Sequence, residues 1–262
     1  MPEDTSTPAE QIEEMVKKEQ QNNEPKILVA VPCQEMLNVN FVNSLLSLKR
    51  PPKSSIVFTQ SSILPQSRDT LANIAISNGF THILFVDSDM TFPADALNRL
   101  YKRDVDIVTG LCFARKGEHN PCIYKRINYE NPVKGKTNGN ITVEDDIDRE
   151  FFEVKACGMA FCLIKTKVLV DIRNQNEGEL FKYIATFGED LSFCVRALKA
   201  GYKIYCDTTF NVGHVGEYIF GKKDWIMSQA VKKAEAEKKR LLEEEQLKLK
   251  ESEDAVSETI PG

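Results

Sequence analysis

Short apolar segments that alternate with amphipathic ones constrain the fold of this chain more than any other feature. Residues 26–31 (KILVAV) form a continuous apolar run that ends at Pro32, as expected for a strand buried on both faces. Further strands are predicted at 56–59, 82–86, 106–109, 153–164 (interrupted at Gly158) and 202–206, and helices at 38–48, 68–78, from Pro93 onward and at 191–200. Repeated β-α-β units predict an α/β fold, a Rossmann-type sandwich in which a mostly parallel central sheet is flanked by helices.

The two ends differ in composition from the central segment 25–221. Residues 1–24 are rich in Glu, Gln, Asn and Pro, which predicts a mobile arm. This arm resembles neither a secretory signal nor a transit peptide, so we expect a cytoplasmic protein. Residues 222–253 lack Gly and Pro and predict one long charged helix, followed by a tail to residue 262. Its broken apolar stripe fits either a solvated helix or a weak coiled coil that joins an oligomer or a partner.

Composition excludes several classes of protein. Hydrophobic residues make up 42% of the chain, which is enough for a sizeable core, and no run is long enough to span a bilayer. The net charge of −5 argues against a general nucleic-acid partner. The seven cysteines include no C-x-x-C pair and are expected to be reduced thiols; His119 and Cys122 lack the second ligand pair that a zinc site needs.

The ends of the predicted strands carry the candidate chemistry, because ligands of open α/β sheets gather at the carboxyl ends of strands. The third strand runs directly into Asp87, Ser88 and Asp89. In an extended segment, Asp87 and Asp89 would face one space and Ser88 would point away. Two adjacent carboxylates repel each other, and Mg²⁺ or Mn²⁺ would relieve that repulsion. The alternative is that Asp89 caps the helix that opens near Pro93.

Two later segments add candidate residues. Glu189 and Asp190 form an acidic pair at the start of the 191–200 helix, where they could also serve only as favourable charges at a helix N-terminus. His214 lies between Gly213 and Gly216 in a loop after the last strand. A lone histidine is more often a packed residue than a ligand, but glycines let a backbone approach a ligand closely and an imidazole is acceptable to Mn²⁺.

Taken in order, these motifs resemble those of GT-A fold glycosyltransferases. The resemblance covers about residues 26–218 and is greatest to compact bacterial and phage-type members related to the inverting family of nucleotide-sugar transferases. It rests on V-P at 31–32, R-D at 68–69, FVDSDMTFP at 85–93, DIVTG at 106–110, GMAF at 158–161, GEDLSFCVRALKAGY at 188–202 and VGHVG at 212–216. It implies a GT-A-like domain over 25–221, a nucleotide-diphosphate sugar donor (UDP favoured), Mn²⁺ or Mg²⁺, and an acceptor that the sequence does not identify.

The resemblance also implies roles for individual residues. Asp89 and His214 would hold the metal, and Asp87 would face the ribose or assist the metal. Asp190, with Glu189 beside it, would supply the catalytic base. The donor would be bound by Pro32, Cys33, Gln34, Glu35, Arg68, Asp87, Ser88, Gly158 and Met159. Two features depart from the family: Arg68-Asp69 replaces the usual Arg-Asn, and the polar segment 115–149, predicted as a loop-rich insertion or a small hairpin, has no counterpart.

The chemistry of sugar transfer is compatible with these residues. A divalent cation stabilises the departing diphosphate, and a carboxylate takes the proton of the acceptor hydroxyl. We therefore expect a single displacement with inversion and Asp190 as base.

Three other functions use the same residues. Asp87 in the D-x-D-x-T segment 87–91 fits the nucleophile of haloacid-dehalogenase-type phosphatases, although that motif normally follows the first strand. A sugar-1-phosphate nucleotidyltransferase would need a Gly-rich loop after the first strand, and residues 31–34 supply none. A non-catalytic carbohydrate-binding protein of the same fold would have no need to keep Asp87, Asp89, Asp190 and His214 together.

Overall fold

A seven-stranded sheet forms the centre of the molecule, in the order β2-β1-β3-β10-β5-β11-β8. The computed structural model describes residues 24–61, 63–115, 118–132, 140–176, 178–216 and 219–257, so the predicted N-terminal arm lies outside the described residues except for Glu24. The strands are β1 (Ile27–Cys33), β2 (Ser55–Gln60), β3 (His82–Val86), β5 (Ile107–Gly110), β8 (Phe151–Val154), β10 (Phe161–Lys165) and β11 (Ile204–Asp207). β1, β2, β3, β5 and β11 run in one direction, and β10 and β8 are antiparallel to their neighbours. The mostly parallel sheet that the sequence predicts is confirmed.

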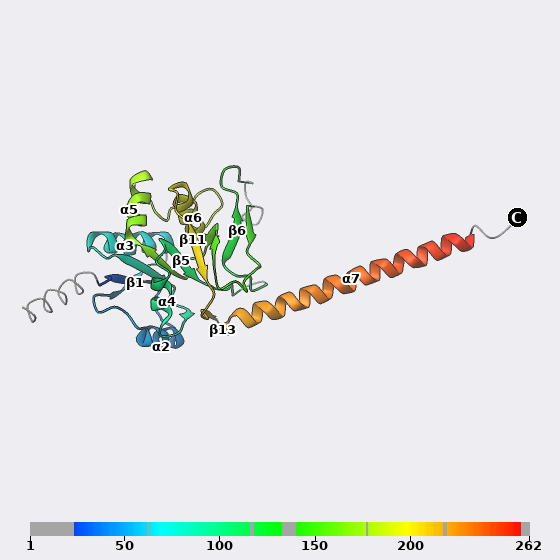
Figure 1. Cartoon of the computed structure of the whole chain (residues 1–262), viewed down its shortest axis with the longest axis horizontal. Helices are drawn as coiled ribbons and strands as arrows, with labels where there is room; N and C mark the ends of the chain where they lie inside the picture. Colours follow the sequence, from blue (N-terminus) through cyan, green and yellow to red (C-terminus); the bar gives the residue numbers. More distant parts are fainter. Residues whose placement is uncertain are drawn as a thin grey trace, which may run out of the picture.

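Helices cover both faces of this sheet (Figure 1). α2 (Val39–Ser47) and α4 (Ala96–Lys102) pack on one face, against a core that includes Val29 and Val31 of β1. α3 (Leu64–Ser77), α5 (Thr166–Gln175) and α6 (Glu189–Lys199) pack on the other, where Leu28 and Ala30 point. Both faces of β1 are therefore buried, as its unbroken apolar sequence predicts.

Several predicted boundaries are wrong. α3 begins at Leu64 with Pro65 in its first turn, so Arg68 lies inside the helix and does not open it. The strand predicted at 153–164 is three separate strands, β8, β9 (Ala156–Cys157) and β10, because the chain changes sheet around Gly158. α5, which follows β10 directly, was not predicted. Its Val168, Leu169 and Ile172 continue the apolar composition of the strand before it, so composition does not mark where the strand ends.

Two small sheets complete the body. β4 (Met90–Thr91) pairs with β12 (Gly213–Val215), which also pairs with β13 (Ile219–Phe220). β6 (Ile123–Ile127) pairs antiparallel with β7 (Ile141–Val143) and with β9. The segment predicted as an insertion thus contains an antiparallel pair. The β4–β12 pairing matters most for the site, because it brings the residues after β3 beside those around His214.

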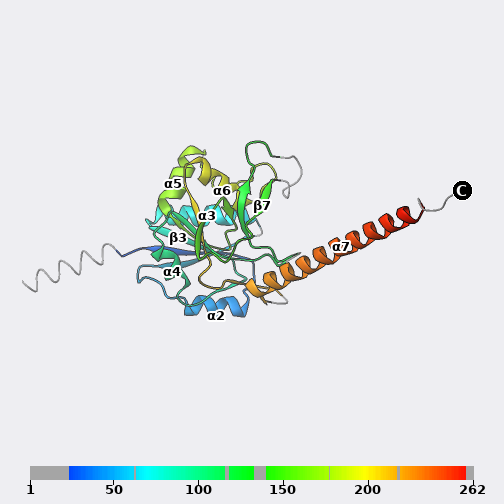
Figure 2. The same cartoon turned by 45° about the vertical axis from the view of Figure 1, so that its right-hand side comes forward.

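The last helix, α7 (Lys222–Ser257), is 36 residues long. The long charged helix predicted over 222–253 is confirmed, and it ends four residues later than predicted. Figures 1 and 2 show that it leaves the body beside β13 and extends away from it as a single rod. Within the part of the chain that the structure describes, no helix is both long enough and apolar enough to cross a bilayer.

Candidate functional site

A cavity of about 500 Å³ opens where β1, β2 and β3 end. This is the edge at which an open α/β sheet binds ligands. The cavity is lined by Pro32, Cys33, Gln34, Met36, Ser61, Leu64, Asp87, Ser88, Asp89, Arg115 and His214. Seven of the residues predicted from the sequence lie here together. Met36, Leu64 and Arg115 were not predicted as site residues, and Ser61 was not assigned a role although it follows the second strand.

The segment Asp87–Asp89 is a turn and not the extended strand end that the sequence analysis assumed. The Met90 amide donates to the Asp87 carbonyl over 3.2 Å, which closes the turn. Ser88 lines the same cavity as the two aspartates. The capping alternative for Asp89 also does not hold, because α4 begins at Ala96 and its N-cap residue is Asp95.

Asp89 and His214 meet across the β4–β12 ladder. The register places His214 opposite Met90, and the Val215 amide donates to the Asp89 carbonyl over 2.7 Å. His214 Nδ1 lies 2.8 Å from the Phe113 carbonyl oxygen, which can only accept, so Nδ1 carries a proton. Nε2 lies 3.2 Å from Asp89 Oδ2. If the imidazole were neutral with its proton on Nδ1, the lone pair of Nε2 would face the Asp89 carboxylate oxygen, and the two would repel each other. A proton or a cation must therefore lie between Nε2 and Asp89 Oδ2.

The charges around Asp89 hold it ionised. Burial by itself would raise the pKa of the Asp89 carboxyl, but the hydrogen bond and charge of His214 and the charge of Arg115 outweigh burial and lower that pKa. Burial would also lower the pKa of His214, and Asp89 and the Phe113 carbonyl more than reverse this effect. Arg115 Nη1 lies 3.2 Å from Asp89 Oδ2 and donates to the Val215 carbonyl over 3.2 Å. One feature of the sequence could have indicated that Arg115 belongs to the site: it lies in the loop that follows β5.

Arg68 is not a lining residue of this cavity. Its side chain is only 2% exposed, and Nη2 donates to Asp87 Oδ1 over 2.8 Å. Its Nε lies 3.6 Å from Glu189 Oε1. Burial works against the guanidinium charge, but Asp87, Glu189 and Asp190 raise the pKa of Arg68 above its usual value. Its charge joins Asp87 to the acidic pair of α6. The predicted contact of Arg68 with the nucleotide stays a prediction.

That acidic pair opens α6, just after its N-cap residue Gly188. Burial, followed by the charge of Glu189, raises the pKa of Asp190 to about 6. The Leu191 amide donates to Asp190 Oδ1 over 2.7 Å. A Cβ on Gly158 would lie 3.7 Å from Asp190 Oδ2 and 3.3 Å from Cys122 Cβ, so glycine keeps the space beside this carboxyl open.

Three residues named in the sequence analysis do not line this cavity. Met159 is 1% exposed and packs in the core. Glu35 is exposed and is not among the lining residues. The Asp69 carboxylate accepts from the Leu180 and Phe181 amides, both over 3.3 Å, so the residue that departs from the family pattern anchors the segment before α6.

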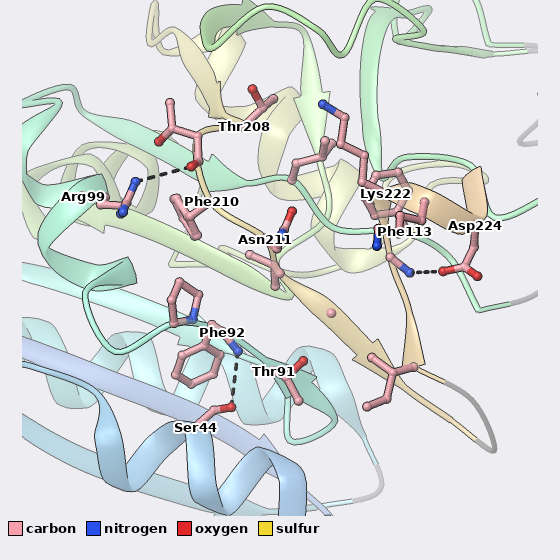
Figure 3. Close-up of a pocket in the computed structure, with 18 residues that line it drawn as sticks. Ser44, Thr91, Phe92, Arg99, Phe113, Thr208, Phe210, Asn211, Lys222 and Asp224 are labelled. Atoms are coloured by element: carbon pink, nitrogen blue, oxygen red, sulfur yellow. Dashed lines mark hydrogen bonds between the residues drawn. The ribbon is translucent and has the colours of Figure 1, made fainter. Parts of the chain in front are cut away.

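A second cavity, of about 720 Å³, lies beside β4 and β12 (Figure 3). Phe92, Phe113 and Phe210 supply aromatic surface, while Arg99 and Lys222 bring positive charge. None of the predicted site residues lines it. Thr91 and Gly213 contribute to its wall, and a Cβ on Gly213 would lie 2.5 Å from Thr91 Oγ1. Gly213 therefore permits the close approach of β12 to β4 that places His214 beside Asp89.

The described residues contain no group of three or more His, Cys, Asp or Glu side chains placed to hold a metal by themselves. All seven cysteines are free, and five of them are buried. Any cation at Asp89 and His214 would thus need ligands from another source.

The chain was also compared with known proteins. It matches no protein-family model and no curated protein. Among solved structures, it is similar to the crystal structure of A197 from STIV (TM-score 0.48, 14% identity, covering 73% of this chain and 86% of that one). It is also similar to S. aureus TarS 1–349 (TM-score 0.42, 16% identity), covering 70% of this chain and 60% of the TarS chain. These likenesses are weak, and the functional proposal rests on the geometry of the site.

Proposed function

We propose that this protein is a glycosyltransferase that moves a sugar from a nucleotide-diphosphate donor to an acceptor hydroxyl, with UDP as the nucleotide that the sequence resemblance favours. One observation carries the proposal. The Asp87-Ser88-Asp89 turn and His214 line one cavity at the carboxyl ends of the parallel strands, although Asp89 and His214 are 125 residues apart in the sequence. The cavity volume of about 500 Å³ lies in the range of small-molecule sites.

The residues present fit a hard divalent cation. Carboxylate oxygen and imidazole nitrogen are acceptable to Mn²⁺, and carboxylate oxygen suits Mg²⁺. His214 has its Nδ1 proton directed to the Phe113 carbonyl, the usual way in which a ligating histidine is oriented, so Nε2 could bind a cation shared with Asp89. Asp89 and His214 would hold the ion, with the donor diphosphate completing its ligands. When bound, such an ion stabilises the negative charge that grows on the leaving diphosphate.

The roles proposed for the remaining residues do not depend on the cation. Arg115, beside Asp89, is placed to attract the diphosphate. Asp190 is the candidate base: with a pKa of about 6 it is mostly ionised at neutral pH and can accept the proton of the acceptor hydroxyl. Arg68 would hold Asp190's neighbour Glu189 and the turn residue Asp87 in fixed relation. We infer a single displacement, which inverts the anomeric centre.

Thermal-shift measurements with a panel of nucleotide sugars test the proposal, because a ligand that binds only the folded state raises its melting temperature. We expect stabilisation by one nucleotide sugar that requires Mn²⁺ or Mg²⁺ and disappears with EDTA. The variants Asp89→Asn and His214→Asn should lose this metal-dependent shift, and Asp95→Asn, at the N-cap of α4, should retain it. Absence of any shift across the panel would contradict the proposal.

Two further measurements separate the alternatives. Metal-dependent hydrolysis of the donor would distinguish an enzyme from a non-catalytic sugar-binding protein. Transfer of radiolabelled phosphate to Asp87 would instead favour the phosphatase, whose nucleophile that residue would be. We do not expect it, because Asp87 is held by Arg68 through a 2.8 Å ion pair. The anomeric configuration of the product, read by NMR, tests the inferred inversion.

A further inference from the structure

Two side chains meet at one oxygen of Asp89, in the cavity at the ends of β1, β2 and β3. Arg115 Nη1 and His214 Nε2 each lie 3.2 Å from Asp89 Oδ2. The Arg115 side chain is 45% exposed, and it lines the cavity together with Asp89 and His214. The charge of Arg115 and the charge of a metal ion bound by Asp89 and His214 would therefore meet at the same oxygen.

The Arg115 guanidinium and a metal ion compete for Asp89. An ion bound to Asp89 Oδ2 at the usual distance would lie no more than about 5 Å from Arg115 Nη1 in its present place. A doubly charged ion and a guanidinium repel each other strongly at this distance, because the site is partly shielded from water. Asp89 supplies a single negative charge for both, and Asp87 beside it is already paired with Arg68 over 2.8 Å. Binding of the ion therefore favours departure of the Arg115 guanidinium.

The backbone just before Arg115 is anchored, so its side chain is the part that can move. Phe113 forms an antiparallel bridge with Pro121. The Phe113 carbonyl also accepts the Nδ1 proton of His214 over 2.8 Å. The Arg115 side chain is long and has several rotatable bonds, so a change of rotamer takes its guanidinium away from Asp89 without disturbing these contacts.

One edge of the Arg115 guanidinium has room for a second anion. Nη1 contacts Asp89 and donates to the Val215 carbonyl over 3.2 Å. Nε and Nη2 form the adjacent edge, and they make no hydrogen bond to any residue that the structure describes. Arginine binds phosphate groups through two parallel N–H···O bonds of this kind. A diphosphate in the cavity would therefore give Arg115 a new partner and would attract the metal ion that Arg115 repels.

We propose that Arg115 is a switch between the empty and the loaded site: it holds Asp89 when no metal ion is bound and moves to the donor diphosphate when the ion binds. This inference rests on the proposed function, because it requires both the ion and the diphosphate. Arg115 weakens binding of the ion to the empty site and strengthens binding of the donor to the metal-loaded site. The ion and the donor therefore bind cooperatively, and each raises the affinity of the other by the same factor.

Titration with Mn²⁺ alone tests the first half of the switch, with the unbound ion measured by electron paramagnetic resonance. Arg115→Met should bind Mn²⁺ about tenfold more tightly than the parent, because a positive charge beside the ion is removed. Arg99→Met is the matched control, since Arg99 is 43% exposed and also pairs with an aspartate, and it should leave the Mn²⁺ affinity unchanged. Circular dichroism checks that both variants are folded. Equal Mn²⁺ affinities of Arg115→Met and the parent would overturn the proposal.

The same titrations with UDP present, corrected for the Mn²⁺ that UDP binds in solution, test the second half. UDP should raise the Mn²⁺ affinity of the parent by about tenfold and that of Arg115→Met much less. Arg115→Lys separates charge from shape. It keeps the positive charge, so Mn²⁺ alone should bind as in the parent, but it lacks the planar fork, so the effect of UDP should be smaller. No effect of UDP on the parent, or an equal effect on Arg115→Met, would overturn the proposal.

Failure of the switch is distinguishable from failure of the proposed function. Mn²⁺ binding that is lost in Asp89→Asn but is the same in the parent and in Arg115→Met would leave the metal site in place and show that Arg115 does not compete for it. Mn²⁺ binding that is absent from the parent and from Arg115→Met, or that persists in Asp89→Asn, would instead contradict the metal site itself. None of these readouts requires the acceptor or a rate of transfer.

Discussion

The Asp87–Asp89 turn after β3 and the Glu189–Asp190 pair at the start of α6 contain the same kind of side chain, but their surroundings differ. Cations surround the first: Arg68 holds Asp87, while His214 and Arg115 hold Asp89, whose pKa is lowered. In the second, burial and the neighbouring Glu189 raise the pKa of Asp190 to about 6. In the proposed function, this difference in environment suits one pair to holding positive charge and the other to moving a proton.

The replacement Asp190→Asn should cause the largest loss, about 10³-fold in the rate of transfer, because it removes the group that accepts the proton. Donor affinity, measured by titration calorimetry, should be unchanged. A carboxyl whose pKa is raised by folding stabilises the fold less as the pH rises from about 4 to 6, so this variant should be no less stable than the parent at pH 7. Near-normal transfer would place the base elsewhere.

Replacement of Asp89 by Asn should cost about 10²-fold in transfer and abolish metal-dependent donor binding, because the cation loses a protein ligand. The contrast with Asp190→Asn lies in what fails, binding in one case and chemistry in the other. If Asp89→Asn binds donor and metal as the parent does, Asp89 does not hold the metal, and the proposed difference in role between the two acidic pairs is wrong.

Arg68→Met should destabilise the fold by about 3 kcal/mol, because it leaves Asp87 and Glu189 without their shared buried cation. Urea denaturation measures this change. Arg99→Met is the matched control, since its pair with Asp95 is exposed and of the helical i,i+4 kind, and it should leave stability nearly unchanged. Equal effects of the two replacements would show that Arg68 does not join the acidic pairs as described.

The pH profile of transfer should fall about tenfold per pH unit below about 6, because Asp190 must be ionised to accept a proton. Initial rates at saturating donor and metal would show this acidic limb. It should be absent from the residual activity of Asp190→Asn. A limb that persists in the variant would belong to another group.

Gly213→Ala should have the smallest effect, a loss of about 1–3 kcal/mol of stability with weaker metal binding. The new Cβ would lie 2.5 Å from Thr91 Oγ1 and force β12 away from β4, which moves His214 relative to Asp89. Adding Thr91→Ala removes that oxygen and should restore part of the metal binding. No recovery in the double variant would indicate that another contact, such as the one to Ile219, sets the spacing.

Much of the candidate site was predictable because strand ends converge. Pro32 follows an apolar run and Asp87 follows another, and parallel pairing of β1 and β3 brings their ends to one edge of the sheet. Prediction failed where the course of the chain or the burial of a side chain depends on tertiary contacts, which the local sequence does not encode. The turn at Ser88 is closed by the hydrogen bond from the Met90 amide to the Asp87 carbonyl, and Arg68 is buried where it pairs with Asp87.

What the sequence by itself determined is the alternation of strands and helices, the α/β class, the long α7 and the positions of the acidic pairs, because periodicity and composition are local properties. Only the tertiary structure decided that β10 lies antiparallel between β3 and β5 and that Arg115 and His214 meet at Asp89. It also decided that the pKa of Asp89 is lowered while that of Asp190 is raised to about 6. Each of these depends on contacts between residues far apart in the chain, and burial and charge at such contacts are set only when the chain has folded.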